Sequence, residues 1–259
     1  MIDAPEEPVK TKEYEPLVIS SRALIGKPPD ESTESIADEE EFAPSQILRQ
    51  HPLAQALAPE ALKAPLLSLS LLIFASVWRW QSHGTDLWSV QKEALVHRHE
   101  FWRAFTSILV HADLVHLLSN ASLFVLFAWF LGSYFGAKAF PLLSFAGGAL
   151  TMALTALSYE DEVSLLGASG MVYFMCGLWL FLFARHADYL SLGQRLMRIL
   201  AFILVVLVPT QWDPSVSYRS HAIGLVLGLG TGLFGGPWLQ PKPALASMGT
   251  RQIEPDPDR

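Results

Sequence analysis

The sequence predicts an all-α membrane protein, and two observations support this fold class. Hydrophobic residues make up 51% of the 259 residues, and the mean hydropathy is +0.31 although the first sixty residues are polar. The hydrophobic residues also gather in long runs after residue 60. Several of these runs approach the roughly 20 apolar residues that a transmembrane helix needs. An ordinary soluble domain would not be this apolar.

Six such runs predict six membrane-spanning helices within a domain at residues 61–240. Their ranges are 65–80, 114–135, 140–157, 169–183, 196–208 and 220–239. Lys and Arg near the helix ends number seven on the side of the N-terminus and five on the other side. Because positive residues favour the cytoplasmic side, we expect both termini in the cytoplasm. No apolar run follows Met1, so we expect no cleavable signal peptide, and a bacterial inner membrane is the default location.

The segments outside this domain are polar. Residues 1–60 contain 13 acidic and 5 basic residues together with eight prolines, so we expect a mostly disordered acidic arm. Composition favours a solvated tether, with partner binding as the alternative. Residues 241–259 predict a disordered tail. Neither the arm nor the domain has the positive excess of a nucleic-acid-binding protein, and no nucleic-acid partner is expected.

Polar groups in three of the predicted helices need an explanation, because ionisable side chains are costly inside a membrane. His111, His116 and Asn120 lie at the start of the second helix, and the last two share one helix face. Ser169 lies between glycines at the junction from a loop into the fourth helix. His221 lies in the first turn of the sixth helix. With the N-terminus inside, all these groups lie on the same side of the membrane.

A row of glycines follows His221, with a spacing of four residues: Gly224, Gly228, Gly232 and Gly236. Such a row lets another backbone approach closely. The fourth helix offers a matching face at Ser169, Tyr173 and Gly177. Packing the two faces together would bring the His221 imidazole within reach of Ser169, which is the geometry that a serine nucleophile requires.

Each of these groups also has a simpler interpretation. Serine and asparagine in membrane helices often only join helices, and a glycine row by itself indicates tight packing. The histidines suggest a metal site, yet His99 and Glu100 are followed by Phe101, Trp102 and Arg103, without the second histidine of the HExxH motif. We therefore expect no metal. The single cysteine, Cys176, excludes a cysteine-built zinc site.

In combination, these motifs resemble the rhomboid family of intramembrane serine proteases from about residue 64 to 239. The matching residues are Trp102 and Arg103 of a first-loop pair, His111, His116 and Asn120 of HxxxxHxxxN, Gly167, Ser169 and Gly170 of GxSG, Tyr173, and His221, Gly224 and Gly228 of HxxGxxxG. Two positions depart from the family pattern. Ser220 replaces a common alanine, and Gly132 replaces a glutamate that many members carry.

The resemblance implies a six-transmembrane-helix rhomboid-type bundle with a membrane-associated first loop. It implies a Ser169–His221 catalytic dyad, with Tyr173 stacked on the histidine. His116, Asn120 and the backbone N–H of Ser169 would hold the oxyanion. The supporting residues would be Gly167, Gly170, Gly224, Gly228, Trp102 and Arg103. No cofactor is implied.

The implied substrates are membrane-anchored proteins, cut in or near a transmembrane segment. The alternative is a catalytically inactive rhomboid-like protein that binds membrane helices. Such relatives usually lack the serine or the histidine, and both are present here. A small-solute transporter is disfavoured because the sequence shows no internal repeat.

Overall fold

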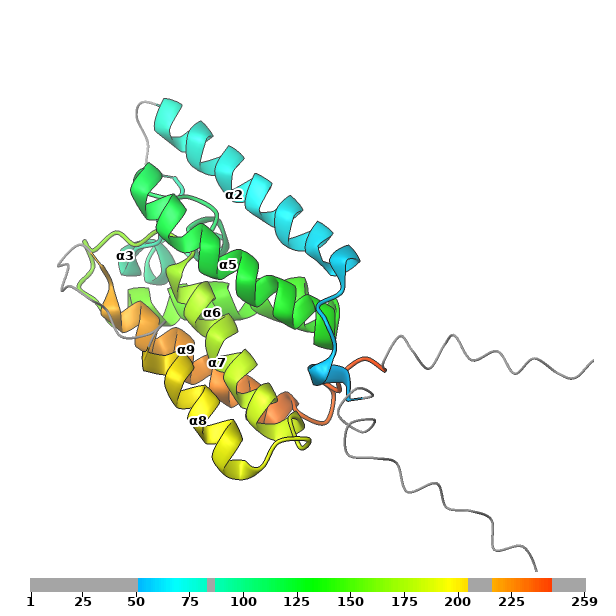
Figure 1. Cartoon of the computed structure of the whole chain (residues 1–259). Helices are drawn as coiled ribbons and strands as arrows, with labels where there is room; N and C mark the ends of the chain where they lie inside the picture. Colours follow the sequence, from blue (N-terminus) through cyan, green and yellow to red (C-terminus); the bar gives the residue numbers. More distant parts are fainter. Residues whose placement is uncertain (1–50, 83–86, 205–215, 244–259) are drawn as a thin grey trace, which may run out of the picture. The chain divides into compact units, whose positions relative to one another are not determined.

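The computed structural model describes residues 51–82, 87–204 and 216–243, which lie within one compact unit, Phe42–Arg259. Within these ranges the chain is helical and contains no β-strand beyond an isolated bridge between Val90 and Leu165. The elements in chain order are η1 (Pro52–Ala54), η2 (Pro59–Leu62), α2 (Lys63–Gln81), α3 (Lys92–Val96), α4 (Arg103–Thr106), α5 (Leu114–Phe135), the π-helical η3 (Lys138–Leu143), α6 (Ser144–Leu157), α7 (Ser169–His186), α8 (Leu192–Phe202) and α9 (Tyr218–Gly235) (Figure 1). The expected all-helical class is confirmed.

Three helical segments of the described chain are long and apolar enough to cross a membrane: Pro59–Gln81, Leu114–Phe135 and Lys138–Leu157. They correspond to the first three predicted spans. α7 begins with the fourth predicted run and continues to His186. α9 covers most of the sixth run but ends at Gly235, before residues 236–239, and α8 overlaps the start of the fifth. Residues 205–208, which end the fifth run, lie outside the described residues. The count of six spans therefore stays a prediction.

The third predicted run differs from a single α-helix at its start. Phe140 has an extended backbone (φ −136°, ψ 126°), and the α-helix begins only at Ser144. The physical reason is Pro141, because the residue before a proline is driven out of the helical region. Asp113 is the N-cap of α5, because its side chain accepts a hydrogen bond from the His116 N–H at 2.8 Å.

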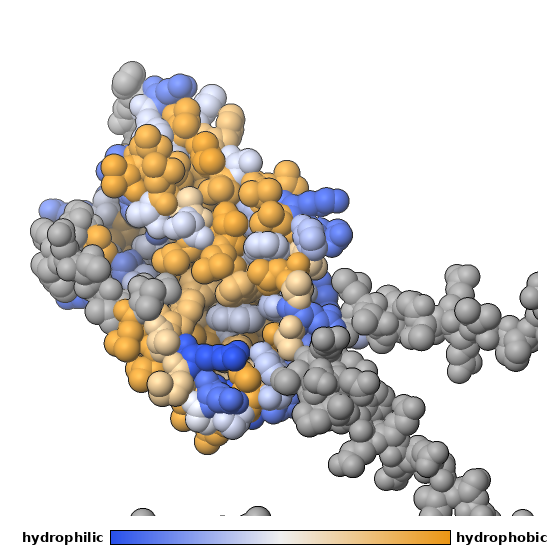
Figure 2. All heavy atoms as spheres, in the orientation of Figure 1, coloured by the Kyte–Doolittle hydropathy of each residue, from blue (hydrophilic) through white to orange (hydrophobic). Residues whose placement is uncertain are grey.

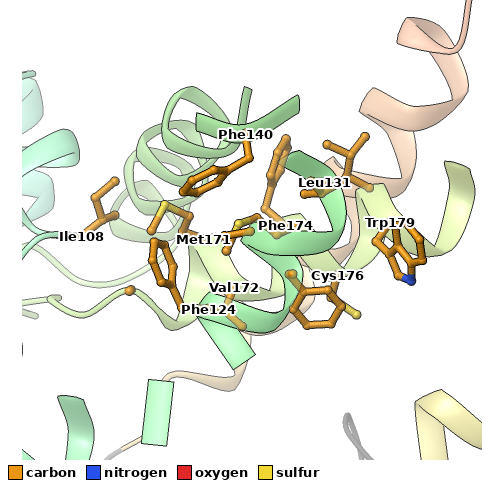
Figure 3. Close-up of a cluster of buried hydrophobic side chains, with 14 of the residues drawn as sticks. Ile108, Phe124, Leu131, Phe140, Met171, Val172, Phe174, Cys176 and Trp179 are labelled. Carbon is orange, nitrogen blue, oxygen red and sulfur yellow. The ribbon is translucent and has the colours of Figure 1, made fainter. Parts of the chain in front are cut away.

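Aromatic and sulfur-containing side chains fill the core between α5, η3 and α7 (Figure 3). Phe124 and Phe140 meet edge to face with ring centroids 5.8 Å apart. Phe174 of α7 is buried, and its ring occupies the space beside Gly147 of α6. Large side chains thus fill one side of α7.

The opposite side of α7 packs against α9 at backbone contact. A Cβ atom on Gly224 would collide with the Gly170 carbonyl oxygen, and one on Gly228 would collide with the Phe174 carbonyl oxygen. A Cβ on Gly177 of α7 would likewise meet the Leu225 carbonyl of α9. We call this the α7–α9 seam. It has the close approach that the glycine spacing predicts.

Large hydrophobic side chains cover the exterior in the view of Figure 2. Leu67 and Phe74 of α2 are 72% and 65% exposed, and Val115 and Leu118 of α5 are 78% and 61% exposed. Water would penalise such a surface, whereas lipid accommodates it at no cost. The surface therefore fits a membrane environment.

The seam predicts a difference between two glycines of α9. We expect Gly228→Ala to lower the free energy of unfolding by about 1–3 kcal/mol, because its Cβ is forced onto the α7 backbone. Gly230 has no atom within 4 Å of an added Cβ, so Gly230→Ala should be neutral or stabilising by up to about 1 kcal/mol. Unfolding midpoints in detergent micelles measure both. Equal midpoints for the two variants would contradict the seam.

Candidate active site

Ser169 is the first residue of α7, and the turn that precedes it has a conformation that requires glycine. Gly167 has φ +114°, which side-chain-bearing residues rarely adopt, and a Cβ there would also collide with the His116 ring. The Gly167 N–H donates to the Ser107 carbonyl oxygen at 2.8 Å. The Ala168 N–H donates to His111 Nε2 at 3.3 Å. Ser107 and His111 of the first loop therefore hold the turn that leads into α7.

His111 connects this turn to α2. Its side chain is fully buried, and its Nδ1 lies 3.2 Å from the Ser76 hydroxyl. Its carbonyl oxygen accepts a hydrogen bond from Trp80 Nε1 at 2.8 Å. Burial, and next the neighbouring His116, lower the pKa of His111 to about 3. The imidazole is therefore neutral near pH 7, as its accepting role toward Ala168 requires.

His221 lies against Tyr173 across the seam. The two rings are stacked, with centroids 4.1 Å apart and an interplanar angle of 7°. Tyr218 meets the same imidazole edge-on at 5.9 Å. The Nε2 atom of His221 is buried and has no hydrogen-bond partner among the described residues. Its ring is held in place by aromatic contacts, with one nitrogen available.

Ser169 and His221 lie at the same end of two helices in backbone contact. Gly170, one residue after Ser169, contacts Gly224, three residues after His221. No hydrogen bond joins the two side chains in the part of the chain that the structure describes. In proteins without bound substrate such contacts are often long and shorten only when substrate is bound. The fold therefore brings the helices of the two groups together and leaves the bond itself unmade.

The expected oxyanion donors lie on the neighbouring face of α5. The His116 ring packs against Gly167 and meets His111 edge-on at 5.1 Å. Asn120 is buried, and its Nδ2 donates to the His116 carbonyl oxygen at 3.0 Å. An amide nitrogen carries two hydrogens, so one remains available. The first N–H groups of α7 also lack intrahelical acceptors, which makes Ser169 a suitable place for negative charge.

Trp102 and Arg103 divide their roles in the first loop. The Arg103 side chain is buried, pairs with Glu100, and donates to the Ser89 carbonyl oxygen at 3.3 Å. Trp102 is 50% exposed, with the Arg103 guanidinium 4.9 Å from its ring centroid. The arginine thus ties the loop together and presents the indole outward, where it suits a membrane interface.

Two structural features near the site, a clamp at Arg219 and the bridge made by His111, have no signal in the sequence. The Arg219 guanidinium donates to the Ser158 carbonyl oxygen at 2.6 Å and lies 4.5 Å from the Tyr159 ring centroid. The Tyr159 hydroxyl is 3.2 Å from the Ser217 hydroxyl. This clamp fastens the start of α9, and so His221, to the end of α6. The bridging role of His111 was also unassigned from sequence, since its partners are distant along the chain.

In the ranges that the structure describes, no three His, Cys, Asp or Glu side chains gather closely enough to hold a metal ion.

Comparison with known proteins assigns the chain to a family. The Rhomboid domain model matches residues 98–238. The putative rhomboid protease YdcA of Bacillus subtilis is 28% identical over 171 residues, which cover 63% of this chain and 85% of that relative. Rhomboid protease GlpG of Pectobacterium atrosepticum is 29% identical over 191 residues, which cover 68% of this chain and 63% of that relative. RHOMBOID-like protein 1 of Arabidopsis thaliana is 29% identical over 135 residues, 52% of this chain and 34% of that protein.

Because the family model covers more than half of its length, the chain belongs to the rhomboid family. Family membership and the three long apolar helices make it an integral membrane protein.

The buried His111 predicts a pH dependence of stability. Its pKa is about 3 in the folded protein against an ordinary 6.5, so the unfolded chain binds the proton first. Stability contributed by this group is complete above about pH 6.5 and is lost toward pH 3, by up to about 1.4 kcal/mol per pH unit. We expect His111→Gln to show a shallower loss between pH 6.5 and 4, because an amide does not titrate in this range. The free energy of unfolding of both proteins, measured across this pH range, tests the prediction. Identical slopes against pH for the wild type and the variant would refute the role given to His111.

Proposed function

We propose that this chain is an intramembrane serine protease that uses Ser169 as nucleophile and His221 as general base. The observation that carries the proposal is the position of the His221 ring, which is stacked on Tyr173 and has a buried, unpaired Nε2. His221 lies on α9, and α9 contacts α7 close to Ser169, the first residue of α7. A serine hydroxyl becomes nucleophilic when a positioned imidazole takes its proton. Three curated relatives belong to the same family, and two of them are named as proteases.

In the proposed first step, His221 Nε2 accepts the Ser169 proton while the Ser169 oxygen attacks a peptide carbonyl carbon. The carbonyl oxygen becomes an oxyanion, held by the Ser169 backbone N–H and by the His116 and Asn120 side chains. The protonated His221 then gives its proton to the leaving amine nitrogen as the peptide bond breaks. An acyl-enzyme on Ser169 remains.

In the second step, His221 removes a proton from a water molecule as the water oxygen attacks the acyl carbon. His221 then gives this proton to the Ser169 oxygen as the acyl–oxygen bond breaks, which releases the carboxylic acid product and restores the Ser169 hydroxyl and the neutral imidazole. Tyr173 keeps the imidazole plane fixed in both steps. Hydrolysis requires water at this end of the helices, where the polar groups of the site gather. No cofactor takes part in the proposed scheme.

The proposed substrates are membrane-anchored proteins cut in or near a transmembrane segment. We further propose six spans with both termini cytoplasmic, an acidic arm at residues 1–60 and a tail at residues 241–259, in a bacterial inner membrane. The positive residues near the helix ends support this orientation. A catalytically inactive protein that binds membrane helices is the competing function.

Labelling of Ser169 separates these two functions. We expect a fluorophosphonate to modify the wild-type protein once, at Ser169, and Ser169→Ala to lose both labelling and at least about 10³-fold of the cleavage rate of a transmembrane substrate. The variant should unfold at the wild-type temperature, because only one hydroxyl is removed. Intact-protein mass spectrometry and a reconstituted cleavage assay are the measurements. A folded wild-type protein that neither reacts nor cleaves would support the binding protein instead.

The oxyanion role predicts a specific effect on turnover. We expect Asn120→Ala to lower kcat about 10²–10³-fold with little change in KM, since the lost donor acts on the transition state. Ser119→Ala is the matched control, because its hydroxyl donates to the same His116 carbonyl oxygen at 2.8 Å and is exposed. Steady-state kinetics in micelles compare them. Equal losses in both variants would assign Asn120 a purely structural role.

A further inference from the structure

A cavity of about 460 Å³ lies at the end of α5 opposite to the candidate active site. η1, η2 and the start of α2 line one side of it, the end of α5 and the start of η3 line a second side, and Lys242 and Pro243 after α9 also line it. None of its lining residues belongs to the proposed catalytic machinery. The cavity is therefore a separate feature of the fold.

Hydrogen bonds between distant parts of the chain hold the walls of this cavity. Trp129 Nε1 donates to the Ala58 carbonyl oxygen at 2.9 Å, and the Tyr134 hydroxyl donates to the Gln55 carbonyl oxygen at 2.8 Å. On the other side, the backbone N–H of Lys242 donates to the Tyr134 carbonyl oxygen at 2.7 Å. The segments before α2 and after α9 are thus both fastened to α5, and the cavity is preformed.

The polar groups of the lining favour an anion. Lys63 and Lys242 contribute two ammonium groups and Glu60 one carboxylate, which leaves one net positive charge. Lys242 Nζ donates to the Gly132 carbonyl oxygen at 3.0 Å and keeps two further hydrogens. Lys63 makes no side-chain hydrogen bond or ion pair in the described ranges. Ser133 also lines the cavity, and its buried hydroxyl has no partner among the described residues.

The depth of the cavity in the membrane follows from the length of α5. Its 22 residues span about 33 Å at 1.5 Å per residue, close to the roughly 30 Å of a bilayer hydrocarbon core. Gly132 and Ser133 at its end therefore lie at the level of the lipid headgroups. Beside the cavity, Leu66, Leu67 and Leu142 are 47%, 72% and 66% exposed, so their side chains face the acyl chains of the same layer.

From these observations we propose that the cavity binds the phosphate-bearing headgroup of an anionic phospholipid. Lys63 and Lys242 pair with the phosphate oxygens, and Ser133 supplies a further hydrogen-bond donor. The acyl chains lie along the exposed leucines of α2 and η3. Basic pockets between helices at a membrane surface bind lipid headgroups in this manner. Bound lipid would link the two chain segments that flank the helical domain to α5.

The test compares lipids on the full-length protein in a neutral detergent. We expect phosphatidylglycerol to raise the unfolding midpoint and to remain bound in native mass spectrometry, whereas phosphatidylcholine does neither. Lys63→Gln with Lys242→Gln should raise the phosphatidylglycerol concentration for half-maximal stabilisation about tenfold or more. Lys138→Gln is the matched control, since Lys138 is an exposed lysine at the same end of α5 that does not line the cavity.

Three outcomes would overturn the proposal. The first is equal stabilisation by phosphatidylcholine, and the second is an equal loss of phosphatidylglycerol affinity in Lys138→Gln. The third is full stabilisation by inorganic phosphate alone, which would make free phosphate the ligand. Because Lys242 also holds the Gly132 carbonyl oxygen, its variant is first checked for its lipid-free unfolding midpoint. If that variant does not fold, Lys63→Gln alone decides, and wild-type lipid affinity in Lys63→Gln would then refute the site.

Discussion

Backbone contact between α7 and α9 sets the geometry of the candidate active site. Gly224 and Gly228 face carbonyl oxygens of α7 without a side chain between them, so the spacing of the two helices is determined by backbone atoms. Backbone atoms have no rotamers, and this spacing is therefore less adjustable than one set by side chains. The stacked rings of Tyr173 and His221 follow from it, because they project from adjoining turns of the same two helices.

A second set of contacts controls the turn that leads into Ser169. His111 receives the Ala168 N–H on one ring nitrogen and lies beside the Ser76 hydroxyl with the other. Because the ring is buried and neutral, a single imidazole joins α2 to the turn before α7. The seam thus positions the candidate base, and the contacts of His111 hold the turn that leads to the candidate nucleophile.

Local signals in the sequence predicted much of this arrangement. The mostly apolar run at residues 114–135 predicted the bounds of α5 as the structure has them, and glycines spaced by four predicted the close packing of α7 and α9. Contacts between distant segments have no comparable signal in the sequence. Arg219 meets Ser158, and His111 meets Ser76, through single side chains whose sequence neighbours show no pattern. The extended Phe140 was also missed, although Pro141 was a visible reason for it.

An experimental structure of the protein phosphonylated on Ser169 would give the distance between Ser169 Oγ and His221 Nε2, and this distance decides whether the two residues form a dyad. The phosphonyl group imitates the tetrahedral intermediate, so the imidazole should then pair with the reacting oxygen. We expect a separation of about 2.6–3.2 Å, with the Tyr173 ring still stacked on the imidazole. A phosphonylated Ser169 with His221 Nε2 still unpaired and directed away from it would rule out the Ser169–His221 dyad.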